Sequence, residues 1–291
     1  MDAAGLLPLC RLVQETEVEG QPAAEKARRF SYDRSLLTAL VDRWRPETHT
    51  FHLPVGEMAP TLQDVCFLLG LPCAGEAVCS PDVPVTWHAD LDARFSIVPR
   101  REGDPPYIAS HVEEPFGPRK TWILQFSVRL YYVSFHYILN LKITSSFYSS
   151  MQPDHMVEEP NEYTVARHLE AYLLWLFGWT MFCTTQGNAV AKSLITYAQR
   201  IADAPLGAVP QFSWASAVLA SMYRGLCDAC TRTNSQAIFA GCPLLLQLWS
   251  YTRFSIARPQ IDFSAFSDDF YGETDVDAPT AGTVWCRRRV R

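Results

Sequence analysis

The sequence carries no surplus of positive charge. It contains 25 Lys and Arg residues and 31 Asp and Glu residues, for a formal net charge of −6. A protein that coats nucleic acid or anionic membrane without specificity would need such a surplus, so this class of function is disfavoured. Charged residues are also scarce, at 19% against 48% hydrophobic residues, which is atypical of a disordered chain. We expect a folded protein of 291 residues with a substantial core, in one large domain or two small ones.

Long hydrophobic runs are missing as well. The strongest membrane candidate, Ala171–Cys183, is shorter than the about 20 residues that a spanning helix needs. Arg167 and Glu170 stand just upstream in the same helical pattern, so a buried core helix is favoured and no membrane association is predicted. No signal peptide is expected from the first residues, and the nine cysteines form no tight framework. A reducing compartment, nucleus or cytosol, is therefore expected.

Motifs for metals are sparse. The single Cys-x-x-Cys pair, Cys227 and Cys230, has no second pair at zinc-ribbon spacing, so core thiols are favoured over a zinc site. His49 and His52, with Glu57 nearby, are three residues apart on an expected strand and would point to opposite faces. Structural histidines are the favoured interpretation, and we predict no metal site.

The periodicity of apolar residues predicts a mainly α fold, a multi-helix globular domain. Thr48–Leu53 alternates like a strand, and Gly75–Cys79 is expected to return beside it, giving a small β-hairpin-like element near residues 48–80. Thr61 is predicted to cap a helix with Asp64 at its third position, and Ser213 to cap another. Around the Thr61 helix, the predicted buried side comprises Leu62, Val65, Phe67, Leu68 and Leu69. The predicted helices run from Ser31 or Asp33 to about Trp44, from Thr61 to Leu69, and over Tyr163–Cys183, Ala189–Ala202, Trp214–Cys230 and Cys242–Tyr251, with one short helix in the proline-rich stretch 80–120.

The densest motif is the run of Trp, His, Pro and Thr at residues 43–54, which leads into the Thr61 helix start. It resembles the opening of the plant mobile domain, a family carried by plant transposable elements and by host proteins such as the maintenance-of-meristems group. Later segments also resemble the family: His168–Trp179, Tyr223–Leu226, Gly241–Arg253 and the Trp285–Arg289 tail. We take the following as a candidate structural or partner-binding motif: Trp44, Arg45, Glu47, Thr48, His49, Phe51, His52, Glu57, Met58, Thr61 and Asp64.

The resemblance implies a plant mobile domain over residues 31–291 after an N-terminal segment 1–30. Family members usually continue past the Trp-Cys-Arg-Arg-Arg motif, so a domain truncated at its C-terminus is expected. The implied function is that of a non-enzymatic nuclear interaction protein of transposon origin, acting in transposon silencing, genome stability or meristem maintenance. Protein partners are expected, a phosphatase 7-type protein among them. Two alternatives stay open: an element-encoded accessory protein that contacts DNA, and a decayed element copy without function.

The family is sometimes labelled aminotransferase-like, a name that predicts a lysine bound to pyridoxal phosphate. The four lysines, Lys26, Lys120, Lys142 and Lys192, lie in no recognisable cofactor context, and the glycines form no phosphate-binding loop. Metal-ligand motifs of a phosphatase are not recognisable either. We therefore predict no cofactor and no catalytic residue. The cluster of Arg287, Arg288, Arg289 and Arg291 is too short to indicate nucleic-acid binding by itself.

Residues 128–152 differ in composition from the rest of the chain, since they lack Gly, Ala, Pro, Asp and Glu but contain Tyr, Ile, Phe, Asn and Lys. Such a composition fits AT-rich codons, and plant introns are AT-rich. Removing the block joins Ser127 to Pro153 and restores a segment similar to the family. We hypothesise a retained in-frame intron; the alternative is an apolar strand or helix added to the domain.

Overall fold

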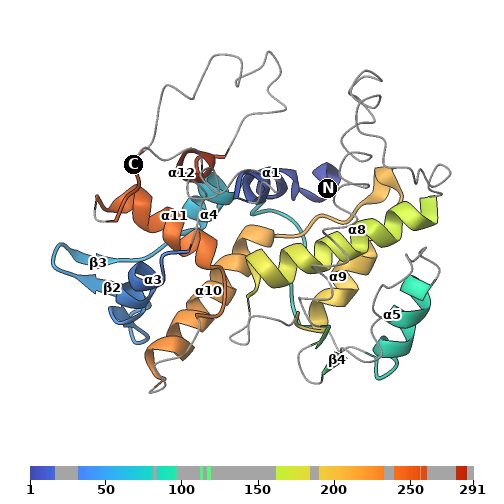
Figure 1. Cartoon of the computed structure of the whole chain (residues 1–291), viewed down its shortest axis with the longest axis horizontal. Coiled ribbons are helices and arrows are strands. Elements are labelled where there is room, and N and C mark those ends of the chain that lie inside the picture. Colours follow the sequence, from blue (N-terminus) through green and yellow to red (C-terminus); the bar gives the residue numbers. More distant parts are fainter. Residues whose placement is uncertain are drawn as a thin grey trace, which may run out of the picture. The chain divides into compact units, whose positions relative to one another are not determined.

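A computed structural model describes residues 1–16, 32–80, 84–96, 112–113, 117–118, 162–183, 190–232, 239–255, 257–260 and 280–286. The chain divides into two compact units. The first comprises Met1–Cys79, Thr180–Thr185 and Val209–Arg291, and the second comprises Ser80–Trp179 and Gln186–Ala208. Helices dominate the described residues of both units, which confirms the predicted fold class (Figure 1).

The first unit is built around three helices, α4 (Leu62–Leu69), α10 (Trp214–Cys230) and α11 (Pro243–Arg253). Both α10 and α11 pack on α4, and α3 (Arg34–Val41) packs on α10 and α11. Every residue from Pro243 to Tyr251 is buried, so α11 is surrounded on all sides as a central core helix is. The short helix η1 (Asp2–Ala4) is followed by α1 (Leu7–Thr16), which contacts α4 and the C-terminal helix α12 (Thr283–Cys286).

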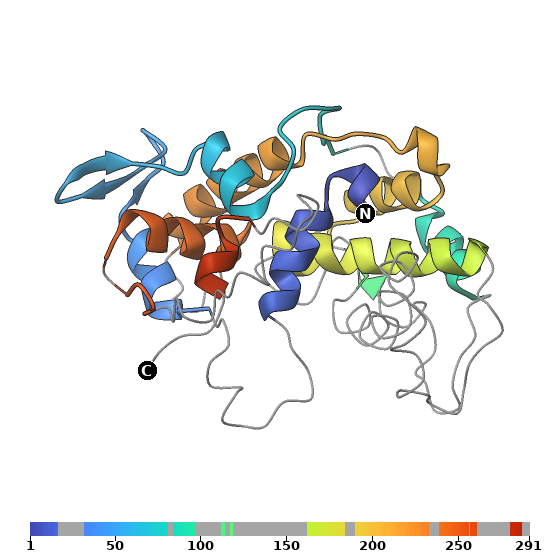
Figure 2. The same cartoon turned by 90° about the horizontal axis from the view of Figure 1, so that it is seen from above.

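A small antiparallel sheet extends from the helices of the first unit (Figure 2). Its strands are β1 (Trp44–Arg45), β2 (Thr50–Leu53) and β3 (Gly56–Met58), in that order. Trp44 pairs with Phe51, and Phe51 pairs with Met58 on the other side. These three side chains share one face of the sheet, and Trp44 and Phe51 are fully buried there.

The second unit contains α5 (Trp87–Ser96), α8 (Glu162–Leu176) and α9 (Ser193–Ala202). Helices α8 and α9 pack against each other, and α9 buries Leu194, Ile195, Ala198 and Ile201 along one face. Helix α8 continues into the π-helical turn η4 (Phe177–Met181), and the 3-10 turn η5 (Leu206–Ala208) follows α9. A two-stranded pair, β4 (Val112–Glu113) and β5 (Gly117–Pro118), completes the described part of this unit. No described helix of either unit has the length and apolar character that crossing a membrane requires.

Three details of the predicted elements are wrong. Gly75–Cys79 does not pair with Thr48–Leu53; Glu76 instead bridges Phe212, and β2 pairs with its sequence neighbours β1 and β3. The first predicted helix ends at Val41 and not near Trp44, because Pro46 drives the preceding residue toward extended backbone and Trp44 joins the sheet. Residues Leu7–Thr16 form a helix inside the N-terminal segment 1–30, where none was among the predicted helices.

Two side chains also differ from expectation. Phe67 is 61% exposed, because at about 100° per residue it lies off the face that Val65, Leu68 and Leu69 share. Ser213 stands at the start of α10 as predicted, yet its hydroxyl donates to the carbonyl of Cys73 instead of capping the helix. The capping prediction at Thr61 is confirmed.

Residues 128–152 and Arg287–Arg291 lie outside the described residues, and the proposed boundaries 1–30 and 31–291 remain predictions.

Gly225 on α10 generates a test of this packing. A Cβ atom at this position would lie 1.9 Å from the backbone oxygen of Ala240, so the chain segment before α11 has to move to admit it. Alanine favours a helix over glycine by about 1 kcal/mol, but overpacking against backbone costs about 1–3 kcal/mol or more. We expect Gly225→Ala to lower the free energy of unfolding by about 1–2 kcal/mol, measured by urea denaturation. Arg224→Ala, an exposed neighbour on the same helix, is the control; a Gly225→Ala protein as stable as this control would contradict the close packing.

Candidate functional site

The motif predicted from sequence divides into a buried half and an exposed half. On the buried face of the sheet, the ring of Trp44 lies edge-on to Phe51, with centroids 4.9 Å apart, and edge-on to Tyr223 of α10, at 5.2 Å. The indole Nε1–H of Trp44 donates to Sγ of Cys227, 3.3 Å away on α10. Phe51 continues the contact to Trp249 of α11, at 5.3 Å. An aromatic chain thus fixes the sheet to two core helices.

His49 holds the turn between β1 and β2. Its φ of 53° is left-handed, a backbone conformation that costs a non-glycine residue free energy. The imidazole ring stacks on Tyr223 at 14° and 6.0 Å and lies 6.3 Å from Trp44. Ring stacking therefore compensates for the backbone conformation, and His49 has a structural role although its residue is exposed.

The opposite face of the sheet is exposed and polar. Thr50 donates its hydroxyl to Glu57 Oε2 at 3.0 Å and lies 2.7 Å from the hydroxyl of Thr48. His52 Nε2 lies 3.4 Å from Glu57 Oε1, with the two side chains 42% and 53% exposed. Arg45 and Glu47 extend the same exposed stretch. This face offers hydroxyl, imidazole, carboxylate and guanidinium groups for hydrogen bonding to another molecule.

The end of the motif anchors α4. Thr61 and Asp64 form a capping box: the Thr61 amide donates to Asp64 Oδ2 at 2.8 Å, and the Asp64 amide donates to the Thr61 hydroxyl at 3.3 Å. The other carboxylate oxygen of Asp64 accepts from Arg253 of α11 at 2.6 Å. Tyr223 donates its hydroxyl to the carbonyl of Pro60, and burial together with the charge of Asp64 raises the pKa of Tyr223. Met58 is half-buried beside Phe51.

The residues of the motif are not arranged as the ligands of a metal ion. In the described parts of the chain, no three His, Cys, Asp or Glu side chains converge as ligands. His49 stacks on Tyr223, whereas His52 faces Glu57 on the other side of the sheet. The thiol of Cys230 donates to the carbonyl of its helix neighbour Cys227 at 3.3 Å. Each of these groups has a partner that explains its position without an ion.

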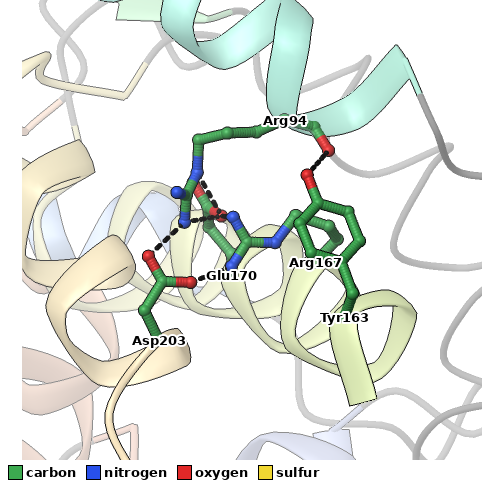
Figure 3. Close-up of polar contacts among 5 residues, drawn as sticks. All are labelled: Arg94, Tyr163, Arg167, Glu170 and Asp203. Carbon is green, nitrogen blue, oxygen red and sulfur yellow. Dashed lines mark hydrogen bonds and ion pairs between the residues drawn. The ribbon is translucent and has the colours of Figure 1, made fainter. Parts of the chain in front are cut away.

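A second polar constellation, in the second unit, was not identified as a site from sequence (Figure 3). Glu170 of α8 is fully buried and accepts hydrogen bonds from two nitrogens of Arg94 of α5: Nε donates to Oε1 at 3.2 Å and to Oε2 at 3.0 Å, and Nη2 donates to Oε2 at 2.8 Å. Arg167, one helical turn before Glu170, places Nη1 2.9 Å from the same carboxylate, and the two groups form an ion pair without a hydrogen bond. Asp203, after α9, accepts from Arg94 at 2.7 Å and from Arg167.

Charge balance explains this constellation. Two guanidinium groups face two carboxylates, so no buried charge stands alone. Burial raises the pKa of Glu170, and the hydrogen bonds and charge of Arg94 and the charge of Arg167 offset only part of that rise. Burial would also raise the pKa of Asp203, but the hydrogen bonds and charges of Arg94 and Arg167 outweigh it and lower that pKa. The arrangement joins α5, α8 and the end of α9, and we interpret it as structural.

The sequence did hold one signal for this constellation. Arg167 and Glu170 lie in a helix with many apolar residues, at a spacing that puts both on one face. A paired charge on a buried face predicts a partner elsewhere, but Arg94 and Asp203 are distant in the chain and could not be assigned without the fold.

The fold and the motif define a mainly helical module that displays a polar hairpin face on a rigid aromatic support. The chain matches the family model described as plant mobile domain over residues 22–98 and 127–286, and it belongs to this family. The second matched range includes residues 128–152, and the intron hypothesis stays a prediction.

Several curated proteins of Arabidopsis thaliana are similar to the chain. Protein MAIN-LIKE 2 is 33% identical over 83% of this chain and 30% of its own length. Serine/threonine-protein phosphatase 7 long form homolog is 34% identical over 97% of this chain but only 18% of its own length. Protein MAINTENANCE OF MERISTEMS is 29% identical over 79% of this chain and 40% of its own length. The chain thus spans less than half of each of these relatives, and no solved structure matches it.

The aromatic support leads to a first prediction for the site. Trp44→Ala removes a fully buried indole with contacts to β2 and α10, and such truncations cost about 3–5 kcal/mol. We expect the free energy of unfolding to fall by that amount in a urea denaturation that circular dichroism monitors. Val55→Ala, at an 80% exposed residue of the same hairpin, should change stability little. Equal stability of the two variants would show that Trp44 does not support the fold.

The charge constellation leads to a second prediction. Glu170→Gln keeps the shape of the side chain but leaves Arg94 and Arg167 with a single carboxylate in a buried setting, which costs roughly 3 kcal/mol. We expect the second unit of this variant to unfold more readily. Faster hydrogen exchange of the α8 backbone amides would measure this loss of stability. Asp90→Asn, on the exposed side of α5, supplies the comparison. Unchanged exchange in Glu170→Gln would remove the stabilising role assigned to the ion pairs.

Proposed function

We propose that this plant mobile domain protein is a non-enzymatic interaction module, and that the exposed face of the hairpin contacts a protein partner. The single observation that supports this proposal is the division of the motif. Trp44, Phe51, Thr61 and Asp64 fix the hairpin and α4 to the core, whereas Arg45, Glu47, Thr48, Thr50, His52 and Glu57 are exposed or half-exposed on the other side.

The hairpin face is suited to specific polar recognition. Its hydroxyl, imidazole and carboxylate groups already form a hydrogen-bonded row from Thr48 to Glu57, so a partner meets groups whose positions are partly fixed. Pre-ordered groups lose less conformational entropy on binding, which favours affinity. The rigid support beneath the row, from Trp44 to α10, keeps the face from moving away when a partner binds.

The face carries both signs of charge, which favours a protein over nucleic acid. Arg45 and Glu47 lie in the same exposed stretch as Glu57, and nucleic-acid binding requires a clear excess of basic residues on one face. The DNA-contacting accessory protein therefore ranks second. For the partner we propose a phosphatase 7-type protein, with a nuclear role in transposon silencing, genome stability or meristem maintenance, and a transposon origin of the chain.

Calorimetric titration of the whole chain with a plant phosphatase 7-type protein tests this proposal. The double variant His52→Ala with Glu57→Ala removes the exposed pair and should weaken binding by about tenfold or more, or about 1.4 kcal/mol. The matched control, Asp228→Ala with Arg232→Ala, removes one acidic and one basic residue that are exposed at the end of α10. Its affinity should equal that of the unaltered protein.

Three results would contradict the proposal in different ways. Equal binding by both double variants would exclude the hairpin face as the contact. No binding by the unaltered protein would exclude this class of partner. Binding to duplex DNA that weakens steeply with salt, together with no protein binding, would favour the accessory-protein alternative.

A further inference from the structure

Thr48 stands at one end of the hydrogen-bonded row on the hairpin face. The residue is exposed, and its hydroxyl oxygen lies 2.7 Å from that of Thr50 and 3.4 Å from Nε2 of His52. Within the described residues, this hydroxyl contacts only those two side chains and no backbone group. A group added to the oxygen would therefore leave the backbone contacts of the turn between β1 and β2 intact.

Two arginines precede Thr48 on the exposed side of the chain. Arg43 and Arg45 are exposed, whereas Trp44 between them is fully buried, as the alternation of side chains along an extended chain requires. Arg45 also pairs with Thr50 across β1 and β2, and side chains that pair in this way share one face of the sheet. The two guanidinium groups and the Thr48 hydroxyl therefore lie on the same exposed face.

The charges of these two arginines are not compensated by the chain. Nη1 of Arg43 donates to the carbonyl of Ala39 at 2.8 Å. Nη1 of Arg45 donates to the carbonyls of Asp42 and Trp44, at 3.3 and 3.1 Å. In the part of the chain that the structure describes, no carboxylate forms an ion pair with either guanidinium group. Both groups can therefore bind carboxylates of another protein.

The spacing of the arginines points to a particular kind of protein. Many serine/threonine kinases choose their substrates by charge, with acidic residues that receive arginines three and five residues before the acceptor hydroxyl. Arg45 precedes Thr48 by three residues, and Arg43 precedes it by five. Among the serines and threonines that the structure describes, Thr48 is the only one with an arginine three residues before it.

We propose that Thr48 is a phosphorylation site for an arginine-directed serine/threonine kinase that uses ATP. The Thr48 oxygen attacks the γ-phosphorus of ATP, and a new P–O bond forms. The bond from that phosphorus to the β,γ-bridging oxygen breaks, and ADP leaves with the electron pair. The hydroxyl proton passes to the catalytic aspartate of the kinase. This site does not depend on the partner binding proposed above for the hairpin face.

A phosphate on Thr48 changes the charge of the hairpin face. It adds about −1.5 to −2 charges at pH 7 to a face on which both signs of charge occur. The imidazole of His52, 3.4 Å from the Thr48 oxygen, and the guanidinium of Arg45 are the basic groups on this face that can receive the phosphate. The carboxylate of Glu57, 3.4 Å from the same imidazole, is repelled by it.

Phosphorylation of the folded whole chain tests the inference. The protein is incubated with magnesium ATP and a kinase that phosphorylates a reference peptide with arginines three and five residues before its threonine. A protease that cleaves before aspartate releases residues 42–63 as one peptide, in which Thr48, Thr50 and Thr61 are the hydroxyl residues. Electron-transfer fragmentation in a mass spectrometer then assigns the phosphate. The expected result is a phosphate on Thr48.

Two matched double variants test the part that the arginines play. Arg43→Ala with Arg45→Ala should lower phosphate incorporation at Thr48 by about tenfold or more, because two charge-assisted contacts with the kinase are lost. Arg224→Ala with Arg232→Ala removes two other exposed arginines and changes the net charge equally, so incorporation at Thr48 should stay the same. Circular dichroism checks that both variants are folded.

Four results would overturn the inference. They are phosphate only on residues other than Thr48, no incorporation while the reference peptide reacts, incorporation into an isolated peptide of residues 42–63 but not into the folded chain, and equal incorporation by the two double variants. The first three concern the unaltered sequence, so they decide the matter even where a variant does not fold.

Discussion

The fully buried indole of Trp44 contacts residues that are far apart in the sequence, and the first unit is organised around it. Its ring lies between Phe51 of the neighbouring strand and Tyr223 of α10, and its single polar atom is satisfied by the sulfur of Cys227. A two-residue strand such as β1 has little stability of its own. The strand exists because the side chain of its first residue is packed on a helix, and the hairpin follows because β2 and β3 pair in register with that strand.

The second unit depends on a different kind of contact. Glu170 and Arg167 are buried in a helix of mostly apolar neighbours, and each would be strongly unfavourable without the other charges. Arg94 from α5 and Asp203 after α9 complete the balance, so three segments must assemble before the buried charges are compensated. Hydrophobic packing alone tolerates small displacements of helices, whereas hydrogen-bonded ion pairs require a defined geometry. This constraint makes the arrangement of α5, α8 and α9 specific.

The sequence predicted those features that local chemistry determines. Thr61 and Asp64 are three residues apart, and the capping box they form needs no other part of the chain. The helices over Trp214–Cys230 and near Pro243–Arg253 follow from apolar periodicity. Features that depend on distant residues were missed or wrong. Within Gly75–Cys79, Glu76 forms its β-bridge with Phe212, and the hydroxyl of Ser213 donates to the carbonyl of Cys73 instead of capping α10. The division of the motif into buried and exposed halves likewise required knowledge of where α10 packs.

The alternation of side chains in the hairpin has a consequence for how such a protein can change over time. Successive residues of β2 serve different purposes, since Phe51 holds the strand to the core while Thr50 and His52 face outward. Substitutions at the outward positions alter the chemistry of the exposed face with little effect on folding, because the neighbouring inward residue retains the attachment. A domain built in this way can change its exposed face without passing through unstable intermediates. In the plant mobile domain family, that separation of surface chemistry from folding would allow one scaffold to carry many different surfaces.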